Sequence, residues 1–269
     1  MESTSPVIRA QGLRLSFGNQ IVLDGIDLEI DAGETMVILG GSGSGKSTLL
    51  RCMVGLQRPD AGSISIKGTD MFSAAPDQVE ELRQRIGMAF QGGALFGSMT
   101  VGENIDLPLS EFTKLPLSTR RIVARIKLAL VDMEKAIDRY PAELSGGMRK
   151  RAAFARAMAL DPEILFCDEP SAGLDPVTAA GLDRLLLRLK DVFGMTLVIV
   201  THELESAFAV ADRIAMIHQG KILIAGTPDE VRECPDPVVR RFLDREPSDD
   251  ADDDHRFRQW MMELEEMNG

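Results

Sequence analysis

The sequence has no apolar run of the length that a membrane-spanning helix needs. A helix crosses a bilayer with about 20 consecutive apolar residues, whereas the longest candidates here, such as residues 196–200, have the length of a buried strand. The first six residues carry neither the basic segment nor the apolar core of a secretory signal. The sequence therefore predicts a soluble chain that stays in the cytoplasm, with any membrane component on another polypeptide.

Cysteine and positive charge are also scarce. Cys52, Cys167 and Cys234 are far apart and lack the spacing of a metal site, so we expect three reduced thiols that pack as small apolar side chains. The chain has 30 Lys and Arg residues against 42 Asp and Glu residues, a net charge of −12. Nucleic-acid binding depends on cations that neutralise phosphates, so this balance argues against nucleic acid as a partner.

What is present is a large apolar core in an α/β pattern. Apolar residues make up 44% of the 269 residues. Residues 7–39 contain four β-rich runs between Gly and Asp turns, which predict an antiparallel subdomain. Helical periodicity dominates from about residue 100 to residue 160 and predicts an inserted helical lobe. The remaining chain alternates short apolar strands with helices, which predicts a doubly wound, mainly parallel sheet.

A glycine-rich loop stands between the apolar run of residues 36–39 and a helix expected to begin near Lys46. The loop fits G-x-x-x-x-G-K-[S/T], which in this context is a triphosphate cradle. Its backbone N–H groups and the helix dipole favour an anion, Lys46 reaches the outer phosphates, and Ser47 is expected to hold Mg²⁺. The alternative is a glycine turn before a surface helix. The residues predicted to bind ATP are Gly40, Gly41, Ser42, Gly43, Ser44, Gly45, Lys46, Ser47 and Thr48.

A second apolar run, residues 164–167, ends in the adjacent carboxylates Asp168 and Glu169. Ligands of such sheets gather at the carboxyl ends of strands, beside the phosphate loop. Asp168 is therefore expected to hold Mg²⁺ through water. Glu169, on the opposite side of the pleat, is expected to orient or deprotonate the water that attacks the γ-phosphate. The alternative is a pair of acidic residues that only face solvent.

Ser145, Gly146 and Gly147 precede a helix rich in Arg and Ala and predict a second anion nest at a helix N-terminus. This nest has no lysine of its own. We therefore interpret it as completing the ATP site of another copy, which implies a head-to-tail homodimer with two ATP molecules between the subunits. The alternative is an N-capped helix whose glycines allow close packing.

These motifs, in this order, resemble the nucleotide-binding subunits of ABC transporters over roughly residues 7–243. The resemblance implies an ABC-type P-loop NTPase that hydrolyses ATP to ADP and phosphate with Mg²⁺. It also implies a nucleotide-binding domain over residues 1–243 with a helical subdomain at about 92–160. Residues 40–48 match the Walker A loop of this family, Asp168 and Glu169 match Walker B, and the nest matches the signature.

Further site residues follow only from the resemblance. Gln91 matches the Q-loop glutamine that contacts Mg²⁺ and senses the membrane subunit, and Asp175 ends the D-loop, which faces the dimer partner. His202 matches the switch histidine that contacts the γ-phosphate. Phe17 matches the aromatic residue that stacks on adenine, although the family more often has Tyr there and a core phenylalanine is the alternative. The implied catalytic residues are Lys46, Gln91, Glu169 and His202, and the implied metal ligands are Ser47, Gln91 and Asp168.

One departure narrows the resemblance. The signature usually ends in Gln, whereas this chain has Met148, which is typical of the branch that serves MCE-type lipid systems, including the Mla phospholipid transporter. Residues 91–109 resemble that branch too. They lie where ABC ATPases receive the coupling helix of the permease, so Leu95, Phe96 and Met99 are candidates for an apolar docking groove. The alternative is a loop packed on the helical lobe.

The resemblance implies an ATPase that powers phospholipid or other lipid transport between a bacterial inner membrane and the outer envelope. It implies a peripheral position on the cytoplasmic side of the inner membrane and a separate permease similar to MlaE. A small STAS-type accessory protein and an MCE lipid-binding protein are the further partners implied. The alternatives are an ABC ATPase for lipoprotein, amino acid or drug transport, and a non-transport ABC protein, which usually has two fused cassettes or a long coiled coil. Intact Lys46, Glu169 and His202 argue against a catalytically inactive cassette.

Residues 244–269 are expected to form an acidic linker and a C-terminal amphipathic helix. The apolar residues recur at helical spacing opposite a charged face. The preferred interpretation is docking on the other ATPase subunit or on a small accessory protein, with the chain's own cassette and a membrane surface as alternatives. The apolar stripe consists of Phe257, Trp260, Met261, Leu264 and Met267.

Overall fold

The computed structural model describes residues 6–246. Its contacts divide the chain into two compact units, Met1–Glu233 and Cys234–Gly269, which are described separately. The expected domain boundary after residue 243 stays a prediction, and the apolar stripe expected in the C-terminal helix lies outside the described residues. Within residues 6–246, none of the helices is both long enough and apolar enough to span a bilayer.

The core of the first unit is a six-stranded sheet with the order β10-β9-β3-β8-β7-β6. Strands β9, β3, β8, β7 and β6 run parallel to their neighbours, and β10 pairs antiparallel with β9. The central strands β3, β7 and β8 are buried along their whole length, as expected for a parallel sheet covered on both faces. The strands are β3 (Thr35–Leu39), β6 (Ile86–Ala89), β7 (Ile164–Asp168), β8 (Thr196–Thr201), β9 (Arg213–His218) and β10 (Lys221–Gly226).

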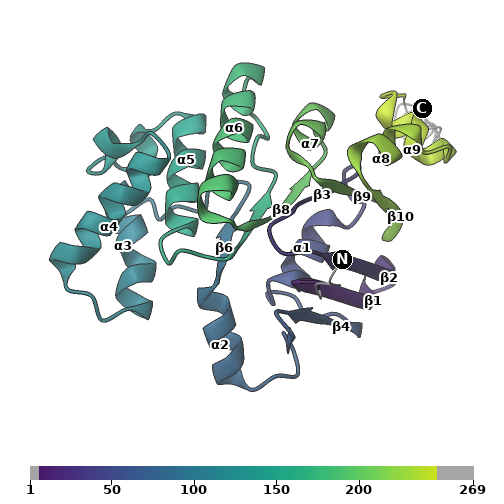
Figure 1. Ribbon diagram of the computed structural model, residues 1–269, viewed down its shortest axis with the longest axis horizontal. Helices are drawn as coiled ribbons and strands as arrows, with labels where there is room; N and C mark the ends of the chain where they lie inside the picture. The colour runs from purple at the N-terminus through teal and green to yellow at the C-terminus, as the bar shows by residue number, and fades with distance from the viewer. Residues whose placement is uncertain (1–5, 247–269) are drawn as a thin grey trace, which may run out of the picture. The chain divides into compact units, whose positions relative to one another are not determined.

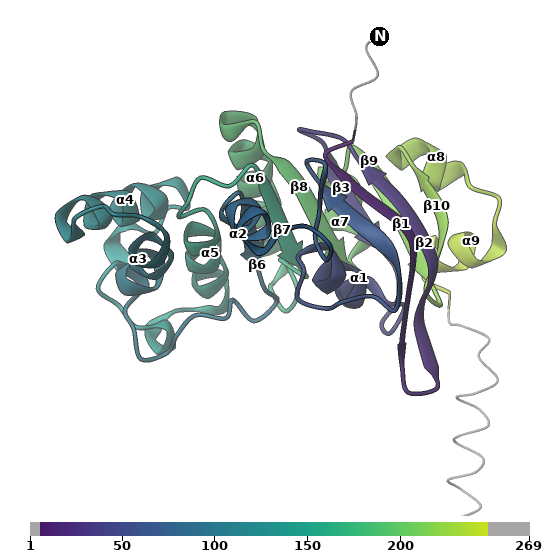
Figure 2. The same ribbon diagram turned by 90° about the horizontal axis from the view of Figure 1, so that it is seen from below.

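A second sheet is antiparallel, with the order β2-β1-β4-β5, and lies beside α1 and the core sheet (Figure 2). Only two long strands, β1 and β2, account for the first four β-rich runs. Bulges shift their register, for example between Ala10 and Leu13, and break the alternation of apolar and polar residues that a regular strand shows. The bounds are β1 (Ile8–Phe17), β2 (Gln20–Ile30), β4 (Ala61–Ile66) and β5 (Thr69–Asp70).

The predicted helical lobe consists of α3 (Val101–Phe112), α4 (Leu117–Leu130) and α5 (Gly146–Ala157), with 3₁₀ turns at Glu134–Ala136 and Pro141–Glu143. Figure 1 shows these helices in teal, to one side of the core sheet. Thr100 begins α3 with a reciprocal cap: its hydroxyl accepts from the Glu103 amide at 3.2 Å, and the Glu103 carboxylate accepts from the Thr100 amide at 2.7 Å.

The other helices of the first unit are α1 (Lys46–Met53), α2 (Pro76–Gln84), α6 (Pro176–Phe193), α7 (Leu204–Val210) and α8 (Pro228–Glu233). Helix α6 has a clear start and stop, with Asp175 as its N-cap, Pro176 in the first turn and a left-handed Gly194 at its end. The second unit contains α9 (Pro237–Leu243). This architecture confirms the predicted fold class: a mainly parallel core sheet, an antiparallel subdomain and a helical subdomain.

The strand order brings distant segments together at one edge of the core sheet. Strand β8 lies between β3 and β7, and β6 lies beyond β7. The register pairs Leu39 with Thr201 and Asp168 with Val200, so these parallel strands end at nearly the same level. The loops after all four strands therefore face one region, where α/β sheets bind their ligands.

Candidate active site

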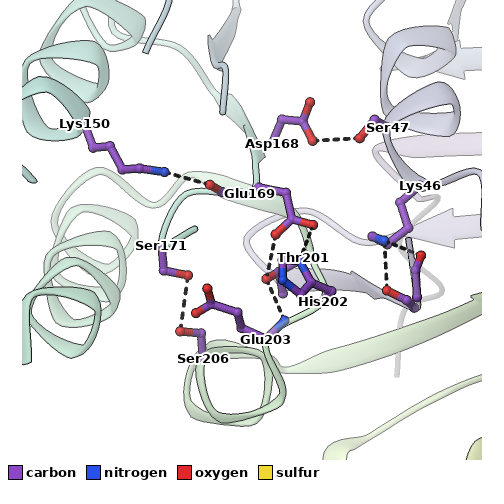
Figure 3. A network of polar contacts seen from close by, with 12 residues as sticks. Lys46, Ser47, Lys150, Asp168, Glu169, Ser171, Thr201, His202, Glu203 and Ser206 are labelled. Atoms are coloured by element: carbon purple, nitrogen blue, oxygen red, sulfur yellow. Dashed lines mark hydrogen bonds and ion pairs between the residues drawn. The ribbon is translucent and has the colours of Figure 1, made fainter. Parts of the chain in front are cut away.

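The phosphate loop, residues 40–45, joins β3 to α1. The backbone is too crowded for a side chain at Gly40, because a Cβ atom there would lie 2.3 Å from the Ile217 carbonyl oxygen. Gly45 has a φ of 107°, which favours glycine. The Lys46 ammonium turns back over the loop and donates to the carbonyl oxygens of Gly40 and Gly41, each at 2.8 Å (Figure 3). The loop is thus wrapped around a buried cation.

The electrostatics of Lys46 reflect its burial. Desolvation lowers the pKa of Lys46, and the negative charges of Glu169 and Asp168 oppose that shift. The Ser44 hydroxyl is another buried polar group of the loop, and it has no hydrogen-bond partner within residues 6–246. Buried polar groups in native proteins are nearly always satisfied. A buried cation beside an unsatisfied hydroxyl fits an anionic ligand such as a triphosphate.

Asp168, the last residue of β7, connects this strand to the phosphate loop. Its carboxylate accepts a hydrogen bond from the Ser47 hydroxyl at 3.0 Å. Burial raises the pKa of Asp168, and the bond from Ser47 opposes the rise. A carboxylate and a hydroxyl suit Mg²⁺, which is usually held by one or two protein oxygens together with substrate phosphates. Within residues 6–246 there is no cluster of three or more His, Cys, Asp or Glu side chains that makes a self-contained metal site.

We expected Glu169 to point to the side opposite Asp168 because successive residues of a strand alternate sides. That reason is wrong, because Glu169 does not continue the pleat of β7. The strand ends at Asp168, and Glu169 has a φ of 48°, in the left-handed region. This turn, and not the alternation of a strand, directs the carboxylate toward the end of β8. There one oxygen lies 2.9 Å from His202 Nδ1, and the other accepts from the Thr201 hydroxyl at 3.2 Å (Figure 3).

His202 and Gln91 stand on either side of β7. The His202 side chain, after β8, is 50% exposed, so its ring contacts Glu169 while its edge is open to solvent. Gln91 is exposed and follows β6, whose residue Ala89 pairs with Cys167 of β7. Phe17, at the end of β1, is 54% exposed, which rules out the core alternative; its stacking on adenine stays a prediction.

The signature residues form a separate feature at the start of α5. The Ser145 hydroxyl accepts from the Met148 amide at 3.3 Å and caps the helix. A Cβ at Gly147 would lie 2.8 Å from Thr178 Cγ2 of α6, so the nest packs against the helix that Asp175 caps. Hydrogen bonds from Thr178 are the main cause of the lowered pKa of Asp175. Within the described part of the chain, no hydrogen bond or ion pair joins residues 145–147 to residues 40–48.

The sequence reasoning missed two contacts to Glu169. Thr201 is the last residue of an apolar strand, and only the pairing of β7 with β8 shows that it meets Glu169. Lys150 donates from its ammonium to the Glu169 carbonyl oxygen at 2.9 Å. It belongs to a run of basic residues on α5, and nothing in that run distinguishes the one that turns inward.

Comparison with known proteins identifies the class. Residues 23–172 match the protein family described as ABC transporter. With the motif order and the fold, this match shows that the chain belongs to the ABC transporter family, as one of its ATP-binding, ATP-hydrolysing subunits. The predictions of fold class, family and ATPase activity are confirmed.

Individual relatives narrow the class. The chain is 37% identical to MlaF of Escherichia coli K12, the ATP-binding protein of an intermembrane phospholipid transport system, over 90% of both proteins. It is 43% identical over 236 residues to Mkl of Mycobacterium tuberculosis, named a probable ribonucleotide transport ATP-binding protein. That match covers 88% of this chain and 66% of Mkl, so the chain spans just under two thirds of these mycobacterial relatives.

A solved structure supports the fold assignment. It is an ATP-binding cassette captured as a dimer in a post-hydrolysis state with ADP and Pi, and it shares 30% sequence identity with this chain. The TM-score is 0.75, with 82% of this chain and 98% of that chain covered. The resemblance to the ABC transporter family that the sequence indicates is therefore joined by a structural likeness to nucleotide-binding cassettes.

Proposed function

We propose that this chain hydrolyses ATP to power transport of phospholipid, or a similar lipid, through a separate membrane permease. The likeness to MlaF over 90% of both proteins supports the lipid cargo, as does Met148 at the end of the signature. The name of Mkl indicates a different cargo, and the ATPase activity is the same for either cargo. The chain then works as a peripheral subunit on the cytoplasmic face of the inner membrane.

The chemistry follows from the side chains at the sheet edge. The main chain of residues 40–48 and the Lys46 ammonium bind the triphosphate, and Ser47 and Asp168, with Gln91, hold Mg²⁺. When bound, Mg²⁺ neutralises charge on the phosphates. Glu169 orients or deprotonates the attacking water, and its contacts with Thr201 and His202 fix its carboxylate.

A homodimer completes this site. The signature nest offers main-chain amides and a helix N-terminus to an anion. Within residues 6–246, no hydrogen bond joins the nest to the phosphate loop of its own chain. A head-to-tail pair brings the nest of one copy to the nucleotide of the other, with Asp175 at the same interface. The dimeric state of the ADP-bound cassette supports this arrangement.

The hydrogen bonds that hold residues 93–100 in place support coupling to the permease through this loop. Asn104 is fully buried, and its amide nitrogen donates to the carbonyl oxygens of Phe96, Met99 and Thr100 at 2.9–3.2 Å, while its oxygen accepts from the Phe96 amide at 2.8 Å. Arg156 of α5 donates to the carbonyls of Gly93 and Ala94. This bracing presents the Phe96 ring 49% exposed beside the Q-loop. A rigid loop with an exposed aromatic ring is suited to protein docking.

Phe96→Asp tests the docking, with Phe112→Asp as a matched control. Phe112, at the end of α3, is 45% exposed, close to the exposure of Phe96, but lies outside the braced loop. A charge in an apolar contact is costly, so Phe96→Asp is expected to release the protein from its permease while ATP binding survives. Co-purification from membranes measures this. If Phe96→Asp still co-purifies at parental levels, this loop is not the permease contact.

Mass spectrometry of the same complex tests the cargo and partners. We expect an integral permease similar to MlaE, an MCE lipid-binding protein, a small STAS-type protein and bound phospholipid. A complex that contains a permease but holds a lipoprotein, an amino acid or a drug in place of lipid would leave the ATPase assignment intact and overturn the cargo. A complex with no permease would favour a non-transport ABC protein.

A further inference from the structure

The backbone of Glu169 has an unfavourable conformation. Its φ of 48° lies in the left-handed region, which is uncommon for residues other than glycine. The next residue is Pro170, whose ring restricts the residue before it to extended conformations. Such a conformation persists only where the surroundings fix it. The contacts of the Glu169 main chain therefore decide where its carboxylate points.

Three hydrogen bonds hold the Glu169 main chain. The Glu169 amide donates to the Val200 carbonyl at 2.9 Å and continues the pairing of β7 with β8. The Glu169 carbonyl accepts from the Lys150 ammonium at 2.9 Å and from the Ala172 amide at the longer distance of 3.3 Å. Pro170 has no N–H, so this carbonyl is the hydrogen-bonding group of the peptide that joins Glu169 to Pro170. One hydrogen bond comes from the core sheet and one from the turn after Glu169. The third comes from Lys150 of the helical subdomain and is drawn in Figure 3.

Lys150 is suited to this task by its surroundings. Its side chain is half-buried, and desolvation lowers its pKa against the opposing charges of Glu203 and Glu169. The ammonium therefore lies in a weakly hydrated position, where a hydrogen bond to a carbonyl is stronger than in water. The neighbouring Arg149 instead donates to the Leu144 carbonyl within its own segment, so it does not replace Lys150.

We propose that Lys150 is a positioning residue for ATP hydrolysis: it holds the Glu169 carbonyl, and so sets the direction of the carboxylate that acts on water. This inference rests on the proposed role of Glu169. Lys150 acts through Glu169 and not on the nucleotide. Because Lys150 and Ser145 belong to the same end of α5, the contact also links the signature of a chain to the glutamate of that chain's own site.

The first test replaces the ammonium and keeps the aliphatic stem. Lys150→Met is expected to lower kcat about 10-fold to 10²-fold, since small misplacements of catalytic groups have effects of this size. KM for MgATP and the affinity for ATP are expected to stay within about twofold of the parent. Lys150→Arg is expected to recover most of kcat because a guanidinium also donates to a carbonyl. Lys135→Met, which removes an exposed lysine from the same subdomain, is the matched control and is expected to keep the parental rate.

The second test places Lys150→Met in a Glu169→Gln background under single-turnover conditions. If Lys150 acts through Glu169, the second substitution adds no further loss, whereas independent roles give additive losses. An unchanged kcat in Lys150→Met, a loss confined to KM, or additivity in the double variant each overturns the proposal. Lys150→Ala, which also lacks a donor, serves if Lys150→Met unfolds. A Glu169→Gln variant that hydrolyses ATP at the parental rate would instead show that the proposed role of Glu169 is wrong.

Discussion

Two helix N-termini in this chain present glycine-rich main chain, and they differ in what surrounds them. The phosphate loop before α1 encloses the buried Lys46 ammonium, and Ser47 beside it meets Asp168 from a strand more than a hundred residues later in sequence. The signature nest before α5 is half-buried to exposed, and its Ser145 hydroxyl caps its own helix. Within residues 6–246, no hydrogen bond or ion pair joins the nest to a lysine or to a carboxylate of the core sheet.

The difference shows which half of a site a chain can complete alone. The phosphate loop assembles its charges by folding, because neighbouring strands of the core sheet deliver them to one edge. The nest has main-chain donors but lacks the lysine and the carboxylate that accompany the phosphate loop, so its function requires another molecule. Glycine loops at helix N-termini are alike in sequence, and the groups around them distinguish a complete cradle from a half-site.

The largest effect is expected on the phosphate-loop side. Lys46→Ala removes the buried cation and is expected to abolish tight ATP binding. Glu169→Gln is expected to retain ATP, to trap the closed dimer and to lower hydrolysis by about 10² to 10⁴, the usual contribution of a general base. Phosphate release and nucleotide binding, measured in the full complex, separate the two variants. Parental turnover by Glu169→Gln would contradict the assignment.

The next prediction tests whether the nest is a half-site. Gly146→Asp places a carboxylate where a phosphate is expected, yet an acidic residue in the first turn suits a helix, so folding is preserved and hydrolysis is lost. Mixing Gly146→Asp with Lys46→Ala creates mixed dimers in which one of the two sites is intact, and activity is expected to return above that of either variant alone.

The control for this mixing is Lys46→Ala with Glu169→Gln. Both substitutions affect the nucleotide bound by their own chain, so each site of the mixed dimer stays defective and no activity returns. If Gly146→Asp with Lys46→Ala also fails to recover, the nest does not act on the nucleotide of the other copy.

A smaller effect is expected when alanine replaces glycine in the two regions. At Gly40 the new Cβ meets the Ile217 carbonyl at 2.3 Å, so we expect a loss of about 1–3 kcal/mol in unfolding free energy, as overpacking usually costs. At Gly146 the nearest atom is Leu174 Cδ2 at 3.6 Å, an ordinary contact. Gly146→Ala is expected to be neutral or to stabilise α5 by up to about 1 kcal/mol. Denaturant unfolding checks both, and equal losses would mean that the two loops are equally constrained.

These regions also show what the sequence reveals and what it does not. The phosphate loop and the acidic end of β7 could be predicted because each is a local pattern: an apolar strand followed by residues of defined chemistry. The alternation of strands and helices predicted the sheet for the same reason. The bulges of β1 obscured its length, because an extra residue breaks the two-residue period.

The remaining features depend on contacts that no local pattern encodes. The direction of Glu169 follows from a left-handed turn and from Lys150, which meets it only after α5 packs against β6 of the core sheet. Asn104 gave no signal either: it is one polar residue in a helix, yet it is fully buried and braces the loop around Phe96. The structure brings these residues together, and their proposed roles stay open to the experiments above.

The smallest effects are expected for two carboxylates: Asp168, which is buried beside the phosphate loop, and Asp175, which is exposed beside the signature nest. Burial raises the pKa of Asp168, so its ionised form destabilises the folded state at neutral pH. Asp168→Asn removes this charge and retains an oxygen that accepts from Ser47. We expect Tm at pH 7 to rise while hydrolysis falls. The gain is expected to shrink as the pH falls through the raised pKa of Asp168, because protonation then neutralises the parent as well.

Asp175 is expected to behave in the opposite way. Hydrogen bonds from Thr178 and the first amides of α6 lower the pKa of Asp175, so its ionised form stabilises the cap. This contribution is present above the ordinary carboxyl pKa of about 3.9 and is lost as the pH falls through the lowered pKa of the folded state. Asp175→Asn is therefore expected to lower Tm at pH 7, with a difference that narrows in acid. Calorimetry of both variants between pH 7 and the acid limit of folding measures the two signs. A fall in Tm for Asp168→Asn would contradict the prediction that the ionised Asp168 carboxylate destabilises the fold. A rise in Tm for Asp175→Asn would contradict the prediction that the ionised Asp175 carboxylate stabilises it.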